Sequence, residues 1–500
     1  MNIKRAKQEI KDTIEAYLLR DETGAYALPS IRQRPVLLMG PPGVGKTQIM
    51  EQISQEMGIG LVAYTITHHT RQSAVGLPFI EKKVYGGREY TVTEYTMSEI
   101  VASIYDKIEA AGLAEGILFI DEINCVSETL APTMLQFLQC KTFGSHRIPE
   151  GWVIVAAGNP PEYNKSVREF DVVTLDRIKK ITVEPDFEVW KEYAYQVNIH
   201  PAILSYLNIK RQNFCQIETT VDGKRFATPR GWEDLSELIA VYEKLGKKVD
   251  RDVVGPYIQF PKISKDFANY LELYYKYQND YQVDEILAGK INEALCDKVA
   301  RAPFDEKLSV VGLLLSRLFD AFRRQRLTEL ELELVMARLK AFGRQVETGA
   351  LCEAPAARMK DLAEKLEQET ARSKEAGLLG RRDERVRRSA AAYLEETGRE
   401  MGLAGLDEPA QAWEWLRSRF GERSDRYEEQ QAEAAAMLEH AFDFMEAAFG
   451  DSQEMVIFVT ELNSNEYCIH FLQENGCERY YEYNKRLLFD EQEQMLRAGV

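Results

Sequence analysis

The chain has 500 residues, 45% of them hydrophobic, which gives room for two to four domains with ordinary cores. Its formal net charge of −17 argues against nucleic acid or an anionic membrane as a partner of the whole surface. The seven cysteines include no C-x-x-C pair, which argues against a disulfide or zinc framework, and no apolar run is long enough to cross a bilayer. We therefore expect a cytoplasmic protein.

The first predicted elements are an amphipathic helix over residues 6–19 and a strand over the apolar run 36–39. The strand leads into Gly40–Thr47, which matches G-x-x-x-x-G-K-[ST] in full, and an amphipathic run over residues 48–57 follows. This order predicts a strand, a glycine-rich turn and a helix. Such a turn aims backbone N–H groups at a phosphate, and the helix adds its positive N-terminal end.

The expected nucleotide-binding residues are those of this turn and the residue that follows it: Gly40, Pro41, Pro42, Gly43, Val44, Gly45, Lys46, Thr47 and Gln48. Lys46 would reach the β- and γ-phosphates, and the Thr47 hydroxyl would ligate Mg²⁺. An ordinary Gly/Pro turn before a helix is the alternative, and the flanking strand and helix make it the less favoured one. The sequence therefore predicts a bound nucleoside triphosphate.

Four elements are predicted next: a strand within residues 58–67, an extended piece at 76–81, a hairpin over 84–95 and a helix over 98–111. The hairpin is indicated by two β-prone runs that flank two consecutive glycines. Isoleucines at helical spacing indicate the helix.

A second motif begins with the apolar run 116–120 and ends in Asp121 and Glu122. A run this uniformly apolar suits a strand that is buried on both faces of a parallel sheet, and α/β sheets place ligands at the carboxyl ends of their strands. Asp121 would hold Mg²⁺, and Glu122 would act as the general base that polarises the attacking water. The alternative is a strand that ends in two solvated acids.

A helix is predicted over residues 127–140, and a third buried strand over 151–160 ends in Asn159 and Pro160. An amide at the tip of a strand next to the carboxylate strand is placed to position the water near the γ-phosphate. The alternative interpretation of Asn159 is a turn-forming Asn-Pro pair.

Strands and helices alternate up to a short strand at 178–183 and give way to helices after it. Helices are predicted over 186–198, 201–207 and 232–245, the last with a start signature at Thr228. This order describes an α/β domain with a helical lid.

The region after about residue 250 is predicted to be helical, with helices over 267–278, 283–299, 308–324, 328–345 and 432–449. Residues 354–400 have thin apolar periodicity, which suits long exposed helices in a hairpin rather than a core. A strand over 454–460 and a helix over 465–475 predict a small α/β cap. The expected domain boundaries are 1–184, 185–248, 249–450 and 451–500.

With these motifs in place, residues 30–245 resemble an AAA+ ATPase and, within that superfamily, are most similar to the MoxR-like group. Gly40–Thr47 matches Walker A and Ile117–Glu122 matches Walker B, while Asn159 stands at the sensor-1 position. Leu175–Arg177 matches the arginine-finger segment, and Thr228–Arg230 matches the sensor-2 segment. The lead-in to sensor 1 departs from the Ala-Thr-Gln of that group, because it is Ala-Ala-Gly here.

The resemblance implies a five-stranded parallel sheet, a helical lid and a ring, usually a hexamer, with ATP at the subunit interfaces. It implies that Arg177 acts in trans on a neighbour's ATP, with Arg168 as the competing residue, and that Arg230 senses the nucleotide. MoxR-like proteins act as chaperone-like remodellers of proteins that carry a von Willebrand factor A domain. A nucleic-acid-directed motor and a nucleotide-dependent scaffold with little turnover are the alternatives.

Overall fold

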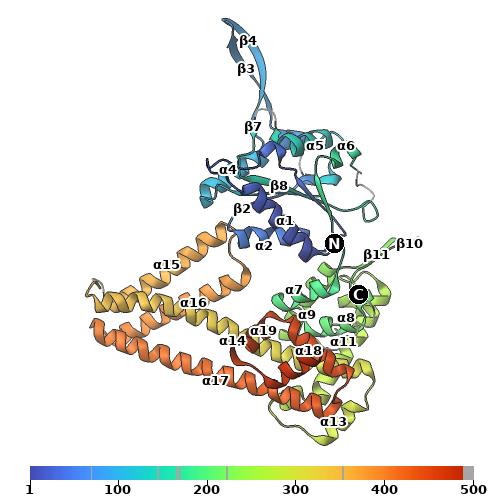
Figure 1. The fold of residues 1–500 in the computed structure, drawn as a ribbon, viewed down its shortest axis with the longest axis vertical. Helices are drawn as coiled ribbons and strands as arrows, with labels where there is room; N and C mark the ends of the chain where they lie inside the picture. Colours follow the sequence, from blue (N-terminus) through green and yellow to red (C-terminus); the bar gives the residue numbers. More distant parts are fainter. Residues whose placement is uncertain are drawn as a thin grey trace. The chain divides into compact units, whose positions relative to one another are not determined.

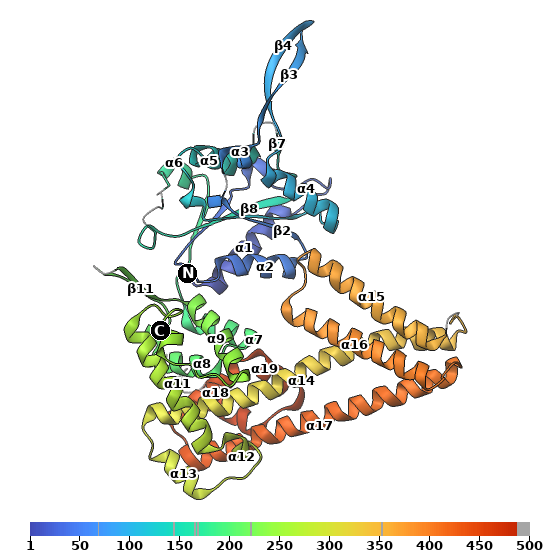
Figure 2. The same ribbon diagram turned by 180° about the vertical axis from the view of Figure 1, so that it is seen from behind.

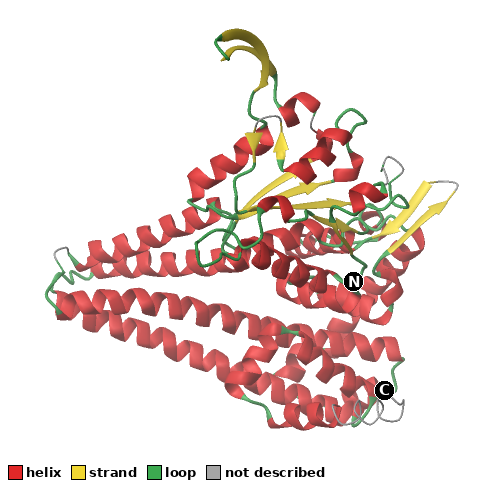
Figure 3. Ribbon diagram, turned by 45° about the horizontal axis from the view of Figure 1, so that its top comes forward, coloured by secondary structure: helices red, strands yellow, loops and turns green. Residues whose placement is uncertain are grey.

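The computed structural model describes residues 1–68, 70–143, 146–164, 167, 170–220, 223–351 and 354–487, and Arg168 lies outside these ranges. The chain divides into two compact units. One comprises Met1–Asp186 and Gln368–Glu384, and the other comprises Phe187–Glu367 and Arg385–Val500. The sheet lies in the first unit, whereas the second is built mostly from helices (Figure 3).

The first unit contains a five-stranded parallel sheet with the strand order β2-β5-β8-β1-β9. Its strands are β2 (Gly60–Thr65), β5 (Gly116–Asp121), β8 (Trp152–Gly158), β1 (Val36–Met39) and β9 (Lys179–Thr182). Every residue of β1 and β8 is buried, as their uniformly apolar sequences predicted. The expected phosphate-loop NTPase core with a parallel sheet is confirmed.

Helices cover both faces of this sheet, because alternate residues of each strand point to opposite sides. Leu37 and Met39 pack with α4 (Glu99–Ala111) and α5 (Ala131–Cys140). Val36 and Leu38 pack on the other face, with α1 (Ile3–Leu18) and α2 (Lys46–Met57). The result is the three-layer arrangement in which the carboxyl edge of the sheet is left for ligands (Figure 1).

A two-stranded hairpin, β3 (Pro78–Tyr85) and β4 (Arg88–Tyr95), projects from the first unit (Figures 1 and 2). The predicted hairpin is confirmed, and the predicted extended piece is part of its first strand. Positive φ angles of 58° and 78° at Gly86 and Gly87 allow the tight turn between the strands. The remaining short elements of this unit are α3 (Arg71–Val75), β6 (Thr142–Phe143), β7 (His146–Arg147) and α6 (Val172–Leu175).

The second unit consists of helices and one small hairpin that the sequence did not predict, β10 (Gln216–Thr220) with β11 (Gly223–Ala227). Its helices before the long ones are α7 (Phe187–Val197), α8 (Pro201–Ile209), α9 (Pro229–Lys244), α10 (Arg251–Val254), α11 (Pro261–Tyr281), α12 (Val283–Leu287) and α13 (Glu293–Ala300). The others are α14 (Phe304–Glu347), α17 (Pro409–Phe449), α18 (Gln453–Ser464) and α19 (Glu466–Asn475). Two more helices, α15 (Pro355–Glu375) and α16 (Arg381–Leu403), belong to both units, because residues 368–384 are part of the first.

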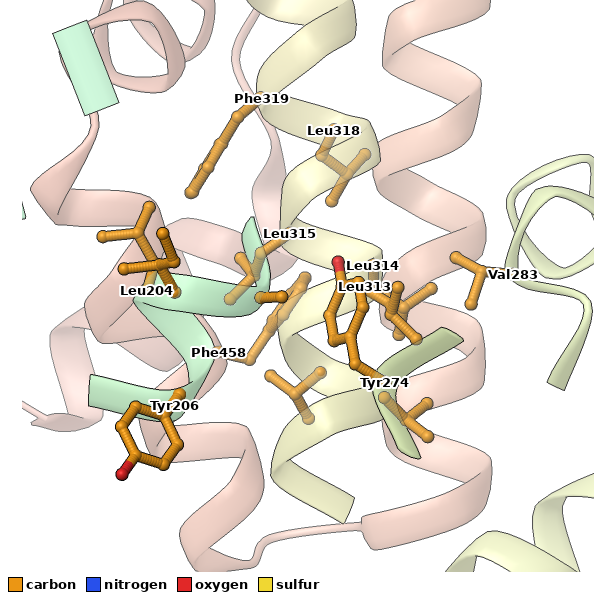
Figure 4. Close-up of a cluster of buried hydrophobic side chains, with 14 of the residues drawn as sticks. Leu204, Tyr206, Tyr274, Val283, Leu313, Leu314, Leu315, Leu318, Phe319 and Phe458 are labelled. Carbon is orange, nitrogen blue, oxygen red and sulfur yellow. The ribbon is translucent and has the colours of Figure 1, made fainter. Parts of the chain in front are cut away.

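One large hydrophobic core joins helices α7 to α14 with α17, α18 and α19, and α14 lies at its centre. Figure 4 shows leucines of α14 among side chains from other helices, including Leu204 of α8, Tyr274 of α11 and Phe458 of α18. Trp232 of α9 packs edge-on against Phe267 of α11, with ring centroids 5.2 Å apart. The helices that follow the α/β domain therefore share their core with those further along the chain.

Two predicted helix ends are wrong. α14 is one helix of 44 residues where two were predicted, and α17, with 41 residues, begins at Pro409 rather than at residue 432. Both wrong ends fall at or next to a polar layer that interrupts the apolar pattern of the two helices. Gln325 of α14 donates to the Tyr427 hydroxyl of α17 at 2.8 Å, and Arg423 of α17 pairs with the buried Glu331 of α14. These bonds between α14 and α17 allow both helices to continue through the layer without an apolar stripe.

Three further predictions are corrected. Residues 283–299 form two helices, α12 and α13, rather than one. Residues 454–460 are helical, since α18 buries Met455, Phe458, Val459 and Leu462 at helical spacing, so the end of the described chain is not an α/β cap. The helices α15 and α16 form the predicted hairpin but also bury apolar side chains with α14 and α17 in a core of their own.

Candidate functional site

The glycine-rich turn follows β1 and delivers Lys46 to the first position of α2. Gly43 and Gly45 have φ angles of 79° and 90°, in the left-handed region that favours glycine. Gly40 is required for a different reason: a Cβ atom there would lie 2.7 Å from the carbonyl oxygen of Val183. The backbone path of the turn therefore depends on its glycines.

The Lys46 side chain is 8% exposed and its ammonium group is held at three oxygen atoms. Nζ donates to the carbonyl oxygens of Gly40 and Pro41, each at 2.8 Å, and to Oδ1 of Asn159 at 2.9 Å. Asn159 follows β8, which lies between β1 and β5 in the sheet. The sheet order thus brings the predicted phosphate-binding lysine and the predicted sensor amide together.

Thr47 and Asp121 also meet at this edge of the sheet. The Thr47 hydroxyl donates to Oδ2 of Asp121 at 2.9 Å, and the backbone N–H of Glu122 donates to Oδ1 of the same carboxylate at 2.9 Å. Hydroxyl and carboxylate oxygens are the ligands that Mg²⁺ takes in nucleotide sites, together with phosphate oxygens and water. The pair therefore fits the metal that the sequence motifs imply.

Glu122 has a left-handed backbone, with φ 56°, which is unusual for a residue other than glycine. Its Oε2 accepts a hydrogen bond from the Thr67 hydroxyl at 3.0 Å. Thr67 lies in a short turn just after β2, the strand next to β5. Sequence reasoning missed Thr67, and its only signal was its place at the end of the neighbouring strand.

Asn124 is a second residue that sequence reasoning missed. It lies in the turn Ile123–Cys125 and is 2% exposed, and its Nδ2 donates to the main-chain oxygen of Asn159 at 2.8 Å. Sγ of Cys125, the residue after Asn124, accepts a hydrogen bond from Nδ2 of Asn164 at 3.4 Å. Burial and the nearby carboxylates of Glu122 and Asp121 raise the pKa of the Cys125 thiol. The turn after Glu122 is thus tied to the stretch after Asn159 at two points.

The side chains of the two predicted arginines, Arg177 and Arg230, are exposed. Arg177 follows the short helix α6, and its Nη1 hydrogen-bonds Oε1 of Gln139 in α5. Arg230 belongs to the second unit, in the first turn of α9, where the Thr228 side chain caps the helix by accepting from the Gly231 N–H at 3.2 Å. The structure therefore brings together Lys46, Thr47, Asp121, Glu122 and Asn159, whereas Arg177 contacts Gln139 and Arg230 belongs to the other unit.

Comparison with known proteins agrees with this geometry. Residues 36–175 match the family model of AAA, the ATPase family associated with various cellular activities. This segment is therefore similar to AAA domains. It contains the whole cluster at the sheet edge and ends before Arg177 and Arg230. No curated protein matches the chain.

Two features are absent from the part of the chain that the structure describes. None of the described helices is both long enough and apolar enough to span a membrane. The described residues also contain no group of three or more His, Cys, Asp or Glu side chains that could hold a metal ion by themselves. A Mg²⁺ ion at Thr47 and Asp121 would accordingly complete its shell with oxygens from nucleotide and water.

Proposed function

We propose that the chain hydrolyses ATP to ADP and phosphate at the carboxyl edge of its sheet. The observation that supports this is the convergence of Lys46, Thr47, Asp121, Glu122 and Asn159 from three neighbouring strands, inside the segment that matches the AAA family. A phosphate-binding turn alone would suit a nucleotide switch. A carboxylate next to the metal-binding aspartate is what hydrolysis needs in addition.

In this proposal each side chain has one task. Lys46 exchanges its hydrogen bonds to the turn for phosphate oxygens, while Thr47 and Asp121 hold the Mg²⁺ that neutralises phosphate charge. Glu122 accepts the proton of the attacking water, and Asn159 orients that water or the γ-phosphate. The hydrogen bond from Thr67 holds the Glu122 carboxylate in place before reaction.

We propose further that Arg177 supplies a second positive charge to the site of a neighbouring subunit in a ring, as the resemblance implies. Its exposure supports this, because an exposed guanidinium is available to another copy. A cation at the developing γ-phosphate charge is worth a factor of about 10³–10⁵ in turnover in related phosphoryl-transfer sites. Arg230 would couple its helix to the nucleotide.

A mixing experiment tests the trans role of Arg177. Arg177→Ala and Glu122→Gln subunits are each expected to turn over little ATP alone. Mixed in equal amounts, random assembly gives about a quarter of the interfaces an intact Glu122 and an intact Arg177, so about a quarter of the wild-type rate should return. No recovery in mixed rings would contradict the trans role. The same mixture with Arg168→Ala decides between the two arginines.

We propose finally that the ring is a MoxR-like hexamer that remodels a partner with a von Willebrand factor A domain. The motif resemblance supports this, and so does the hairpin β3–β4, where Ile80 and Val84 are 75% and 68% exposed. Apolar side chains on a projecting element suit a contact with another protein. Ile80→Ser with Val84→Ser should keep the basal ATPase rate and lose its stimulation by such a partner. Unchanged stimulation would contradict this role of the hairpin.

A further inference from the structure

Asn124 lies between the turn that carries the proposed base, Glu122, and the strand end that carries Asn159. It comes two residues after the proposed base, Glu122, and its side chain is almost completely buried at 2% exposure. Its Nδ2 donates to the main-chain oxygen of Asn159 at 2.8 Å. The side chain of Asn159 in turn accepts from Lys46 at 2.9 Å. Asn159 is therefore held from its main chain by Asn124 and from its side chain by Lys46.

The other half of the Asn124 amide is not satisfied. Among the described residues, Oδ1 of Asn124 has no hydrogen-bond partner although it is buried. Buried polar atoms are nearly always paired, since leaving one unpaired destabilises the folded state. If this residue only filled space, an apolar side chain would give a more stable fold, because it would bury no unpaired oxygen. The amide is thus explained by its donor, which fixes Asn159.

Gly158 makes this arrangement possible. A Cβ atom on Gly158 would lie 2.5 Å from Oδ1 and 2.9 Å from Cγ of Asn124, a distance that real Cβ atoms do not reach. Any larger residue before Asn159 would displace the Asn124 amide. The Ala-Ala-Gly lead-in therefore has a steric reason in this chain: the glycine leaves room for the asparagine.

We propose that Asn124 is a positioning residue that acts through Asn159. By holding the main chain of Asn159, it fixes the position of the Asn159 amide relative to Lys46 and to the γ-phosphate of bound ATP. This inference rests on the proposed ATPase function of the same site. Asn124 itself touches neither nucleotide nor water in this scheme. It links the turn that carries the general base to the strand end that carries the sensor amide.

The first test is the variant Asn124→Leu, which keeps the branched shape of the side chain and removes the donor. Because small displacements of a positioning group cost one to two orders of magnitude, we expect kcat to fall about ten- to a hundredfold. The Kd for ATP should stay within about threefold, since the turn and Lys46 bind the phosphates. In Asn159→Ala the Asn124→Leu change should cause no further loss, whereas additive losses would show that Asn124 does not act through Asn159.

Gln33→Leu is the matched control. Gln33 is also buried, at 6% exposure, and its amide donates to the main-chain oxygens of Tyr17 and Leu28, each at 3.0 Å, ahead of β1. Gln33→Leu removes both of these amide-to-carbonyl bonds and the acceptor of the buried Lys141 ammonium, just before that strand. It should therefore lower stability at least as much as Asn124→Leu while leaving kcat of the folded protein within about twofold of wild type. Equal kcat losses in both variants would overturn the positioning role.

A second test needs no turnover and keeps the inference falsifiable if Asn124→Leu does not fold. Gly158→Ala should lower the denaturation midpoint in the wild-type background, because the new methyl group meets the Asn124 amide. In an Asn124→Ala background the same change should be tolerated, since the amide is gone. Equal losses in both backgrounds would contradict the proposed contact.

The two levels of the proposal fail in different ways. Wild-type protein that hydrolyses no ATP would overturn the proposed function and, with it, the role of Asn124. Wild-type turnover that Glu122→Gln abolishes, together with an unimpaired Asn124→Leu variant, would overturn the role of Asn124 alone.

Discussion

Buried polar groups are distributed differently in the two units of this protein. In the first unit, the buried or half-buried side chains of Lys46, Asp121 and Asn159 reach the carboxyl edge of one sheet from three separate stretches of chain. In the second unit they form separate pairs between helices, such as Lys191 with Glu461. Groups that converge on one edge can regroup around a ligand, whereas an ion pair between two helices holds those helices together. Convergence, rather than burial, marks the proposed reaction site.

The largest expected effect tests whether the converging groups of the first unit carry out hydrolysis. Glu122→Gln keeps the shape of the side chain and its contact with Thr67 but removes the base, so ATP turnover should fall about 10²–10⁴-fold while ATP still binds. Steady-state hydrolysis and nucleotide titration measure the two quantities. Glu150→Gln, at an exposed position before β8, is the control and should behave as wild type. Turnover within about threefold of wild type would remove Glu122 from the mechanism.

The second prediction concerns a buried ion pair that joins two helices of the second unit. Lys191 of α7 and Glu461 of α18 are 2% and 6% exposed, and the Tyr195 hydroxyl also donates to Glu461. Lys191→Met leaves the carboxylate buried without its cation and should destabilise the fold by about 3–5 kcal/mol. Lys191→Met with Glu461→Leu should recover most of that loss. Chemical denaturation measures both variants, and a double variant as unstable as the single one would contradict a role limited to pairing.

The third and smallest expected effect is pH-dependent and concerns Lys141, a buried lysine of the first unit outside the cluster. Its Nζ donates to Oε1 of Gln33 at 3.0 Å, and burial, with a smaller contribution from Arg147, lowers the pKa of the ammonium group to about 8. The unfolded chain holds this proton up to a pKa of about 10.4, so between these values the unfolded state binds more protons and folding stability rises with pH.

Lys141→Met removes this titration. The free energy of unfolding of the variant relative to wild type should therefore fall by about 2 kcal/mol between pH 7 and pH 10. Urea denaturation at the two pH values measures it. A difference between variant and wild type that does not change with pH would show that the folded protein does not depress the pKa of Lys141.

The sheet and the ends of its strands were predictable from the sequence, because a uniformly apolar strand that stops at a charged or amide residue has few other interpretations. Asp121, Glu122 and Asn159 were found in this way. Thr67 and Asn124 were not, since their contacts depend on which strands are neighbours in the sheet. The order of the strands cannot be predicted from a local sequence pattern.

The long helices were harder to predict for a related reason. The polar layer around Gln325 and Glu331 looks like a helix end in the sequence, and only its partners on α17 show that both helices continue. Residues 454–460 have β-prone side chains, but the core that receives Phe458 and Leu462 selects a helix. In both places tertiary packing overrides the local preference.

The central claim is that the turn Gly40–Thr47 and Lys46 hold the triphosphate at the edge of the sheet. The most direct measurement is equilibrium binding of ATP, with Mg²⁺, to wild type, to Lys46→Ala and to the exposed control Lys180→Ala. Loss of a charge-assisted contact to phosphate should weaken binding about a hundredfold in Lys46→Ala and leave the control unchanged. Binding by Lys46→Ala as tight as that of wild type would contradict the assignment of this turn as the nucleotide site.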